Sequence, residues 1–508
     1  SYVVGKFPHY PHPASISSKM MVELGTLTTL MVAAAVVVSG FLTSAVFAVT
    51  SFVYFGVVYI MLPLAKPILK LVLGICYSQA PPNQPMARPT SINSRLLHSH
   101  SHSHSHHSHP QNSPSFQLHS SKKHHPSLHI TNTFTTMSQT LELTGGARDT
   151  YLSVFKSLNL PYNPFPIICW NRHLETIFAS FYRSLPGVKL RRECLRTADD
   201  GSVSLDWVVG DDSALPAESP VLILLPGLTG GSGDTYVQHM LVRARSNKWR
   251  VVVFNSRGCG NSPVTTCQFY SASFTEDLRE VVNHVKSRFP SSNLYAIGWS
   301  LGANILVRYL GEESDNCSLR GAVSLCNPFN LVIADEDFHK GFNNIYDKAL
   351  ARSLAKIFKR HALLFEGIGG EYNIQLAANA KSVRDFDEGI TRVSFGFKSV
   401  DDYYYNSSSS KSIKDVRIPL LCVQAANDPI APARGIPHDD IKDNPNCVLV
   451  VTPKGGHLGW VAGDEAPLGA PWTDTLVMEF LEHLESGRTK DLESSSASGH
   501  TMISSTGF

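Results

Sequence analysis

The chain has 508 residues, of which 43% are hydrophobic and 17% are charged. This composition can bury a large apolar core, which excludes a wholly disordered chain, a collagen repeat and a small disulfide-held protein. The formal net charge is +2, but Lys and Arg outnumber acids by eight to one before residue 141 and number 36 against 41 after it. Nucleic-acid binding needs clustered basic residues, so the mildly acidic body argues against a nucleic-acid partner.

After an N-terminal flank, residues 1–23, the chain contains a long uncharged segment. The 42 residues between Glu23 and Lys66 carry no charged side chain. One bilayer crossing needs about 20 apolar residues, so we predict a membrane anchor within residues 24–80, as one tilted helix or a two-pass hairpin. The alternatives are a cleaved signal peptide, whose apolar region would be only about 7–15 residues long, and a plastid transit peptide.

The charges that flank the apolar segment predict its orientation. More basic residues follow the segment than precede it: Lys66, Lys70, Arg88 and Arg95 against Lys6 and Lys19. For a single pass, the positive-inside bias places the C-terminal body in the cytosol. We therefore expect a protein of an endomembrane such as the endoplasmic reticulum, with a plastid membrane as the alternative.

Residues 81–140 are rich in Pro, Ser, Asn and His, and they bury too little apolar surface to fold. We predict a disordered linker. Half of the histidines, 11 of 22, lie between His98 and His129. Casual zinc or nickel binding is expected of such a tract, but no Cys or carboxylate is interleaved to fix a coordination geometry. We therefore predict neither a physiological metal site nor a cofactor, and the nine widely spaced cysteines are expected to be reduced.

Short apolar runs alternate with longer helix-like segments across residues 141–487. Continuous apolar strands separated by helices indicate a parallel sheet that is covered on both faces, and therefore an α/β fold with right-handed crossovers. The predicted strands occupy residues 221–227, 250–256, 294–300, 321–327, 420–426 and 448–454. Residues of about 330–413 interrupt this alternation and are predicted to be a lid-like insertion, and residues 488–508 a disordered tail.

A candidate nucleophile lies at the end of the third predicted strand. The pattern GxSxG occurs as Gly298-Trp299-Ser300-Leu301-Gly302, after the apolar run LYAI and before the helix-like run LGANILVRYL. A strand, sharp turn and helix around GxSxG is the setting of a nucleophile elbow. Small flanking residues are required because larger side chains would collide in the strained turn. We therefore predict that Ser300 is a catalytic nucleophile.

A serine hydroxyl needs a base to take its proton and a carboxylate to orient that base. In proteins with a nucleophile elbow, the serine comes first along the chain, the acid second and the histidine last. Asp428 follows the strand LLCVQAAN and precedes Pro429, so its carboxylate is predicted to project from the carboxyl edge of the sheet. His457 follows the next strand within Gly455-Gly456-His457-Leu458-Gly459. We predict Asp428 as the acid and His457 as the base.

A tetrahedral oxyanion requires preorganised N–H donors. One is expected from Leu301, the residue after the nucleophile, and the other from the loop Pro226–Gly231, where we predict Leu228 or, as the alternative, Thr229. A glycine-rich turn after a strand can instead cradle phosphate. Neither GxGxxG nor GxxxxGK[ST] occurs in this loop, which argues against nucleotide binding.

Residues of about 150–487 resemble the YheT-like branch of the α/β-hydrolases, which includes bacterial YheT proteins, plant embryogenesis-associated proteins and animal membrane-anchored lipid hydrolases. The resemblance implies hydrolysis of esters or lipid esters, with acylglycerols and phospholipids as substrates of some members. It also implies the nucleophile, acid and base at Ser300, Asp428 and His457. The segments that carry it are WNRHLETI (170–177), LLPGLTGGSGDTY (224–236), NSRGCGNS (255–262), GWSLGAN (298–304), VRDFDEGITRVSFGFKSVDDYY (383–404) and IPLLCVQAANDP (418–429).

Together these features predict a membrane-anchored serine hydrolase that cleaves carboxylic esters, with a lipid acyl ester or another small-molecule ester as its partner. An acyltransferase or a thioesterase would use the same three residues, so these activities remain alternatives. A non-catalytic receptor or scaffold on the same fold is an alternative of a different class. A lipid-binding tether that acts through the first 140 residues is a further one. The sequence does not identify any protein partner.

Overall fold

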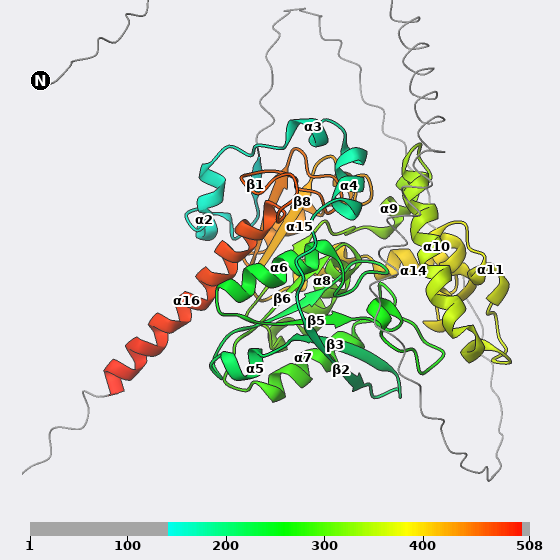
Figure 1. Cartoon of the computed structure of the whole chain (residues 1–508), viewed down its shortest axis with the longest axis horizontal. Helices are drawn as coiled ribbons and strands as arrows, with labels where there is room; N and C mark the ends of the chain where they lie inside the picture. The colour runs from blue at the N-terminus through cyan, green and yellow to red at the C-terminus, as the bar shows by residue number, and fades with distance from the viewer. Residues whose placement is uncertain (1–140, 500–508) are drawn as a thin grey trace, which may run out of the picture. The chain divides into compact units, whose positions relative to one another are not determined.

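A computed structural model describes the backbone of residues 141–499 and the side chains up to Gly487. Its centre is a nine-stranded sheet in the order β1-β9-β8-β7-β6-β4-β5-β3-β2 (Figure 1). The six strands from β4 to β9 are mutually parallel, whereas β1, β2 and β3 pair antiparallel at the two sides. The strands are β1 Glu142–Thr144, β2 Leu190–Arg196, β3 Ser202–Val208, β4 Val221–Leu225, β5 Arg250–Asn255, β6 Leu294–Trp299, β7 Gly321–Leu325, β8 Leu420–Ala425 and β9 Cys447–Thr452.

The predicted α/β fold with a mostly parallel sheet is confirmed. Each predicted apolar run contains one of the strands from β4 to β8, and the last run, 448–454, overlaps β9, which begins one residue earlier. The antiparallel strands were not predicted. β2 has the sequence LRRECLR and is largely solvent-exposed, as an edge strand can be. β3 is buried throughout although it contains Asp206, which pairs with Arg192 of β2 and accepts a hydrogen bond from Asn255. Tertiary ion pairing, which apolar periodicity does not report, allows this strand to be buried.

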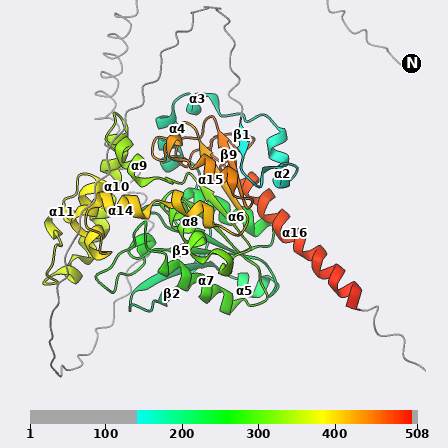
Figure 2. The ribbon, with the colours of Figure 1, turned by 180° about the vertical axis from the view of Figure 1, so that it is seen from behind.

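Helices cover both faces of the sheet. Apolar side chains of α6 and α16 pack on one face, whereas those of α7, α8 and α15 pack on the other. Figure 2 shows this three-layer arrangement from behind. The helices outside the β7–β8 connection are α2 Arg148–Tyr151, α3 Pro166–Cys169, α4 Arg172–Phe181, α5 Asp211–Ala214, α6 Thr235–Ser246, α7 Glu276–Arg288, α8 Leu301–Glu313, α15 His438–Asp443 and α16 Thr473–Gly499, with short helices η1 Lys156–Asn159, η2 Cys259–Asn261, η3 Ser314–Asn316 and η7 Ala433–Gly435.

The connection between β7 and β8 is a helical segment, residues 331–415, which we call the insertion. It has its own apolar core, which includes Phe358, Phe365 and Phe386 and continues onto Phe269 of the β5–α7 connection. The insertion and α16 lie at opposite ends of the domain (Figure 1). Its helices are α9 Leu331–Phe338, α10 Asn343–His361, η4 Ala362–Phe365, α11 Ile374–Ala378, α12 Val383–Phe386, η5 Asp387–Thr391, α13 Arg392–Ser394, α14 Val400–Ser407 and η6 Ser409–Asp415.

Three predicted segments lie outside the described residues: the flank 1–23, the anchor 24–80 and the linker 81–140. Within residues 141–499, no helix is long and apolar enough to cross a membrane. At the other end, α16 continues past residue 487 to Gly499, so the backbone is helical across the first part of the segment predicted to be a disordered tail. The sequence there, RTKDLESSSASG, lacks a proline that would stop a helix.

The contact between α8 and the end of β4 predicts a stability effect. A Cβ atom on Gly302 would lie 2.2 Å from the carbonyl oxygen of Leu225 and 2.5 Å from that of Pro226. Gly302→Ala is therefore expected to destabilise the domain by about 1–3 kcal/mol, because backbone must move to admit the methyl group. The measurement is thermal unfolding of the full chain. Gly187→Ala is the control, since no atom lies within 4 Å of that Cβ position; equal melting temperatures for the two variants would contradict the prediction.

Candidate active site

Ser300 occupies a strained turn between β6 and α8. Its backbone angles are φ 52° and ψ −121°, which L-residues rarely adopt. The flanking glycines allow this turn, since a Cβ on Gly298 would lie 2.6 Å from Cα of Ala303. The side chain of Ser300 is therefore presented at the carboxyl edge of the sheet, above the start of α8, as in a nucleophile elbow.

The structure brings the side chains of Ser300, Asp428 and His457 together although they follow three different strands. His457 Nε2 lies 3.0 Å from Ser300 Oγ. On the other side of the ring, His457 Nδ1 lies 2.9 Å from Asp428 Oδ2 and 3.1 Å from Oδ1. All three residues are buried. This is the chain of contacts in which a carboxylate orients an imidazole that can accept a hydroxyl proton.

Backbone amides hold the carboxylate of Asp428 in place. Its Oδ1 accepts hydrogen bonds from the N–H groups of Ile430 and Ala431, at 2.7 and 2.8 Å. The preceding residue, Asn427, accepts a hydrogen bond from the N–H of Gly456 at 3.0 Å. The loop after β8 is thus joined both to the imidazole of His457 and to the backbone that carries it.

Helix α4 supports the loop of His457 from the other side. Thr176 Oγ1 accepts a hydrogen bond from the N–H of His457 at 2.9 Å, and Glu175 Oε1 accepts one from Val461 at 3.2 Å. The sequence drew attention to WNRHLETI without revealing this role, because α4 and the loop are about 280 residues apart. The sequence signal for this role was the polar pair Glu175 and Thr176 in an otherwise amphipathic helix. Polar side chains on the buried side of a helix need hydrogen-bond partners elsewhere in the fold.

The loop after β4 lies against the nucleophile, and its amides are differently engaged. The N–H of Thr229 donates to Tyr270 Oη at 2.7 Å, and that of Gly227 donates to Tyr236 Oη at 3.0 Å. The N–H groups of Leu228 and Leu301 have no partner among residues 141–499. Of the two predicted alternatives in this loop, Leu228 therefore has the available donor and Thr229 does not.

A cavity of about 540 Å³ opens onto Ser300 and His457. Its wall is formed partly by the body of the domain and partly by the insertion, whose contribution is mainly apolar: Leu331, Phe338, Leu350, Leu354, Ile357, Val383 and Phe386. Such a cavity removes apolar groups from water next to the reactive side chains.

One wall of the cavity carries a buried acid. Burial raises the pKa of Asp387 to about 7, although hydrogen bonds from Thr391 and Tyr404 oppose the rise. Tyr404 Oη donates to Asp387 Oδ2 at 2.9 Å. The charge of Asp335 raises the pKa further, and that of Arg384 lowers it. Asp387 begins η5, a single π-helical turn, and such turns are frequent at functional sites. Asp387 lies within the segment 383–404, but no local pattern there marks it as a buried acid.

No group of three or more His, Cys, Asp or Glu side chains suited to a metal ion occurs in the part of the chain that the structure describes. The histidine-rich tract lies outside it. Eight cysteines fall within residues 141–499, and all of them are free thiols.

Comparison with known proteins shows the family of this chain. Residues 220–461 match the alpha/beta hydrolase fold family. The chain is 69% identical over 352 residues to embryogenesis-associated protein EMB8 of Picea glauca, an alignment that covers 68% of this chain and 77% of that protein. The chain belongs to the α/β-hydrolase fold family. The resemblance inferred from the sequence segments is thereby confirmed.

Other members of the family are more distant. Phospholipase ABHD3 of Mus musculus is 36% identical over 318 residues, which cover 62% of this chain and 76% of that protein. A monoacylglycerol lipase of Saccharomyces cerevisiae is 32% identical over 335 residues, which cover 57% of this chain and 74% of that protein.

The raised pKa of Asp387 predicts a pH-dependent stability. Between the ordinary pKa of 3.8 and the folded value of about 7, the folded domain keeps a proton that the unfolded chain releases. The free energy of unfolding therefore falls as the pH rises through this window. Asp387→Asn is expected to lack this fall, so its melting temperature relative to wild type should be higher at about pH 8 than at about pH 5.

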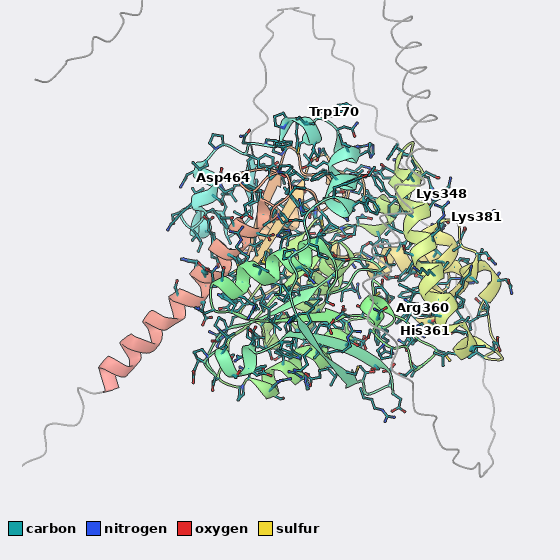
Figure 3. The ribbon with its side chains drawn as sticks, in the orientation of Figure 1. Trp170, Lys348, Arg360, His361, Lys381 and Asp464 are labelled. Atoms are coloured by element: carbon teal, nitrogen blue, oxygen red, sulfur yellow. The ribbon has the colours of Figure 1, made fainter. Side chains whose placement is uncertain are left out.

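Thermal unfolding of the full chain at both pH values tests this. The matched control is Asp464→Asn, an exposed acid on the surface (Figure 3). If the two variants shift equally between the two pH values, the burial of Asp387 does not have the stated effect.

Proposed function

We propose that this protein is a serine hydrolase that cleaves carboxylic esters, and lipid acyl esters in particular. The observation that carries the proposal is the position of His457, which contacts Ser300 Oγ on one side and the Asp428 carboxylate on the other at the base of an apolar cavity. Membership of the α/β-hydrolase fold family and the relatives named as phospholipase and monoacylglycerol lipase support ester hydrolysis.

Catalysis proceeds through an acyl-enzyme. Ser300 Oγ attacks the acyl carbonyl while His457 Nε2 takes the hydroxyl proton, and Asp428 stabilises the imidazolium at Nδ1. The N–H groups of Leu301 and Leu228 hold the oxyanion. The tetrahedral intermediate expels the alcohol, which receives the proton from His457. Water, activated by the same imidazole, then attacks the acyl carbon and releases the carboxylic acid and free Ser300.

The cavity supports a substrate with an apolar acyl chain. Side chains such as Leu350, Leu354 and Ile357 of α10 line the same cavity that opens onto Ser300. Burial of apolar area there favours a long acyl group over acetate by about 25 cal/mol for each Å² removed from water. Ser300, Asp428 and His457 would also serve acyl transfer to an alcohol or thioester cleavage. Only the products of the reaction distinguish hydrolysis from these activities.

The direct test is labelling of the purified full chain with a fluorophosphonate probe, which needs no assumption about the substrate. We expect labelling of wild type and none of Ser300→Ala. Asp428→Asn is expected to reduce turnover of a micellar ester by about 10⁴-fold, because the histidine tautomer is no longer held. Ser246→Ala, at an exposed serine of α6, is the control and should label like wild type.

Two outcomes would contradict the proposal. A near-normal rate for Asp428→Asn would exclude this residue as the acid. The second outcome is that the folded wild-type protein is not labelled and that Ser300→Ala keeps full biological function. This outcome would support the alternative of a non-catalytic receptor or scaffold. Product analysis with and without an added alcohol separates hydrolysis from acyl transfer.

We further propose that residues 24–80 anchor the hydrolase in an endomembrane, with the domain on the cytosolic side. The proposal rests on the 42 uncharged residues between Glu23 and Lys66 and on the charges that flank them. The full chain is expected to stay in the membrane pellet after carbonate extraction, whereas a chain lacking residues 24–80 should be released. Release of both chains would contradict the anchor, and protection of the domain from added protease in sealed vesicles would contradict its cytosolic side.

A further inference from the structure

Helix α10 of the insertion has an unusual distribution of charge. Its 19 residues contain five cations and one acid. The acid, Asp347, is buried and accepts a hydrogen bond from the N–H of Val383 at 2.7 Å. The cations are all exposed, and we call them the basic face: Lys348, Arg352, Lys356, Lys359 and Arg360.

These cations are not neutralised by the domain itself. None of the five forms an ion pair with a described residue, and Arg360 donates only a long hydrogen bond to Asn261, at 3.5 Å. Elsewhere in the insertion, by contrast, Arg384 bridges Asp335 and Asp401, and Arg392 bridges Glu371 and Glu388. Four acids of the insertion are thus paired with arginines that lie outside α10.

The spacing of the cations aligns them along the helix. Steps of three or four residues return to the same side of an α-helix, and Arg352, Lys356 and Lys359 follow each other by four and three. Figure 3 shows Lys348 towards one end of α10 and Arg360 towards the other, with Lys381 of the insertion on the same side of the domain as Lys348. The basic face therefore extends over most of the helix length.

Exposed apolar residues border the basic face at both ends. Ile345 is 53% exposed one turn before Lys348, and Leu363 is 79% exposed one turn after Arg360. At the start of α10, Phe342 and Tyr346 contact the ring of His173 in α4, and Phe342 is 37% exposed. A stripe of cations with exposed aliphatic and aromatic residues around it is typical of helices that lie on membranes, where both groups find partners.

The opposite side of the same helix lines the catalytic cavity. Leu350, Leu354 and Ile357 line the cavity onto which Ser300 and His457 also open. Because an α-helix with its side chains is only about 10–12 Å across, a surface bound to the basic face would lie about one helix diameter from the cavity.

We propose that the basic face of α10 binds the anionic headgroups of a lipid bilayer. Five unneutralised cations attract a negatively charged surface, and the apolar border favours a bilayer over a nucleic acid, which offers no apolar phase. The binding goes beyond the proposed ester hydrolysis and does not require it. It would hold the insertion, and with it the cavity wall, against the membrane that the anchor alone would only keep nearby.

The test is lysine footprinting of the full chain in nanodiscs, with Ser300→Ala as the protein so that turnover plays no part. Acetylation of Lys348, Lys356 and Lys359 is compared between discs of phosphatidylcholine alone and discs of phosphatidylcholine with phosphatidylserine. We expect acetylation at these lysines to be about fivefold slower in the anionic discs, since each cation gains on the order of 1 kcal/mol at an anionic surface. High salt should remove the difference. Exposed reference lysines outside the insertion, which should not change, are Lys156, Lys189 and Lys442.

A charge variant separates the basic face from general proximity. Arg352→Gln with Arg360→Gln leaves the three reporter lysines in place and is expected to lose most of the protection. The matched control, Arg320→Gln with Arg417→Gln, removes two exposed arginines outside α10 and should keep it.

Several outcomes would overturn the proposal: equal protection in neutral and anionic discs, equal loss in the control variant, or protection by an RNA oligonucleotide and not by anionic discs. Since the footprint is read without turnover, failure of the proposed hydrolysis would leave this result unaffected.

Discussion

The close packing of α8 against the carboxyl ends of β4 and β6 is the constraint on which the site depends. Gly298 and Gly302 leave no room for a Cβ, and Ser300 between them has a positive φ. This strain is sustained because β6 is buried between its neighbours β4 and β7 and α8 is buried beneath the insertion. The turn brings the hydroxyl to the edge where the loops after β8 and β9 also end. A parallel sheet makes this meeting possible, because all its carboxyl ends lie on one side.

The histidine loop is held by two segments that are distant from each other in the sequence. The loop after β8 supplies Asn427, which binds its backbone, and Asp428, which orients its ring, while α4 supplies Thr176 to the backbone N–H of His457. A loop containing Gly455, Gly456 and Gly459 would otherwise place an imidazole poorly, because glycine leaves the backbone many conformations. Helix α4 therefore serves the site without contributing a reacting group. The same helix meets the insertion through His173 and Tyr346, at 3.1 Å, so the site and its apolar cover share a support.

The insertion combines two environments on one helix. The inner side of α10 supplies aliphatic side chains to the cavity, and the outer side carries cations that the domain does not pair. The acid Asp387 shows how far the cavity wall departs from water, since burial is the largest of the effects that raise its pKa to about 7. This arrangement suits the proposed cleavage of lipid esters and the proposed binding of an anionic bilayer.

Local sequence determined the parallel strands, the elbow around Ser300 and the order of Asp428 and His457, since each depends on residues adjacent in the chain: an apolar run, small residues in a turn, a polar residue at a strand end. The antiparallel strand β3 depended on tertiary contacts instead. Its buried Asp206 is tolerated because it forms an ion pair with Arg192 and accepts a hydrogen bond from Asn255. The engagement of the Thr229 amide by Tyr270, the support of His457 by Thr176 and the isolation of the α10 cations were likewise decided by tertiary structure. Such contacts join residues tens to hundreds of positions apart, and no local pattern encodes which partner each polar group will find.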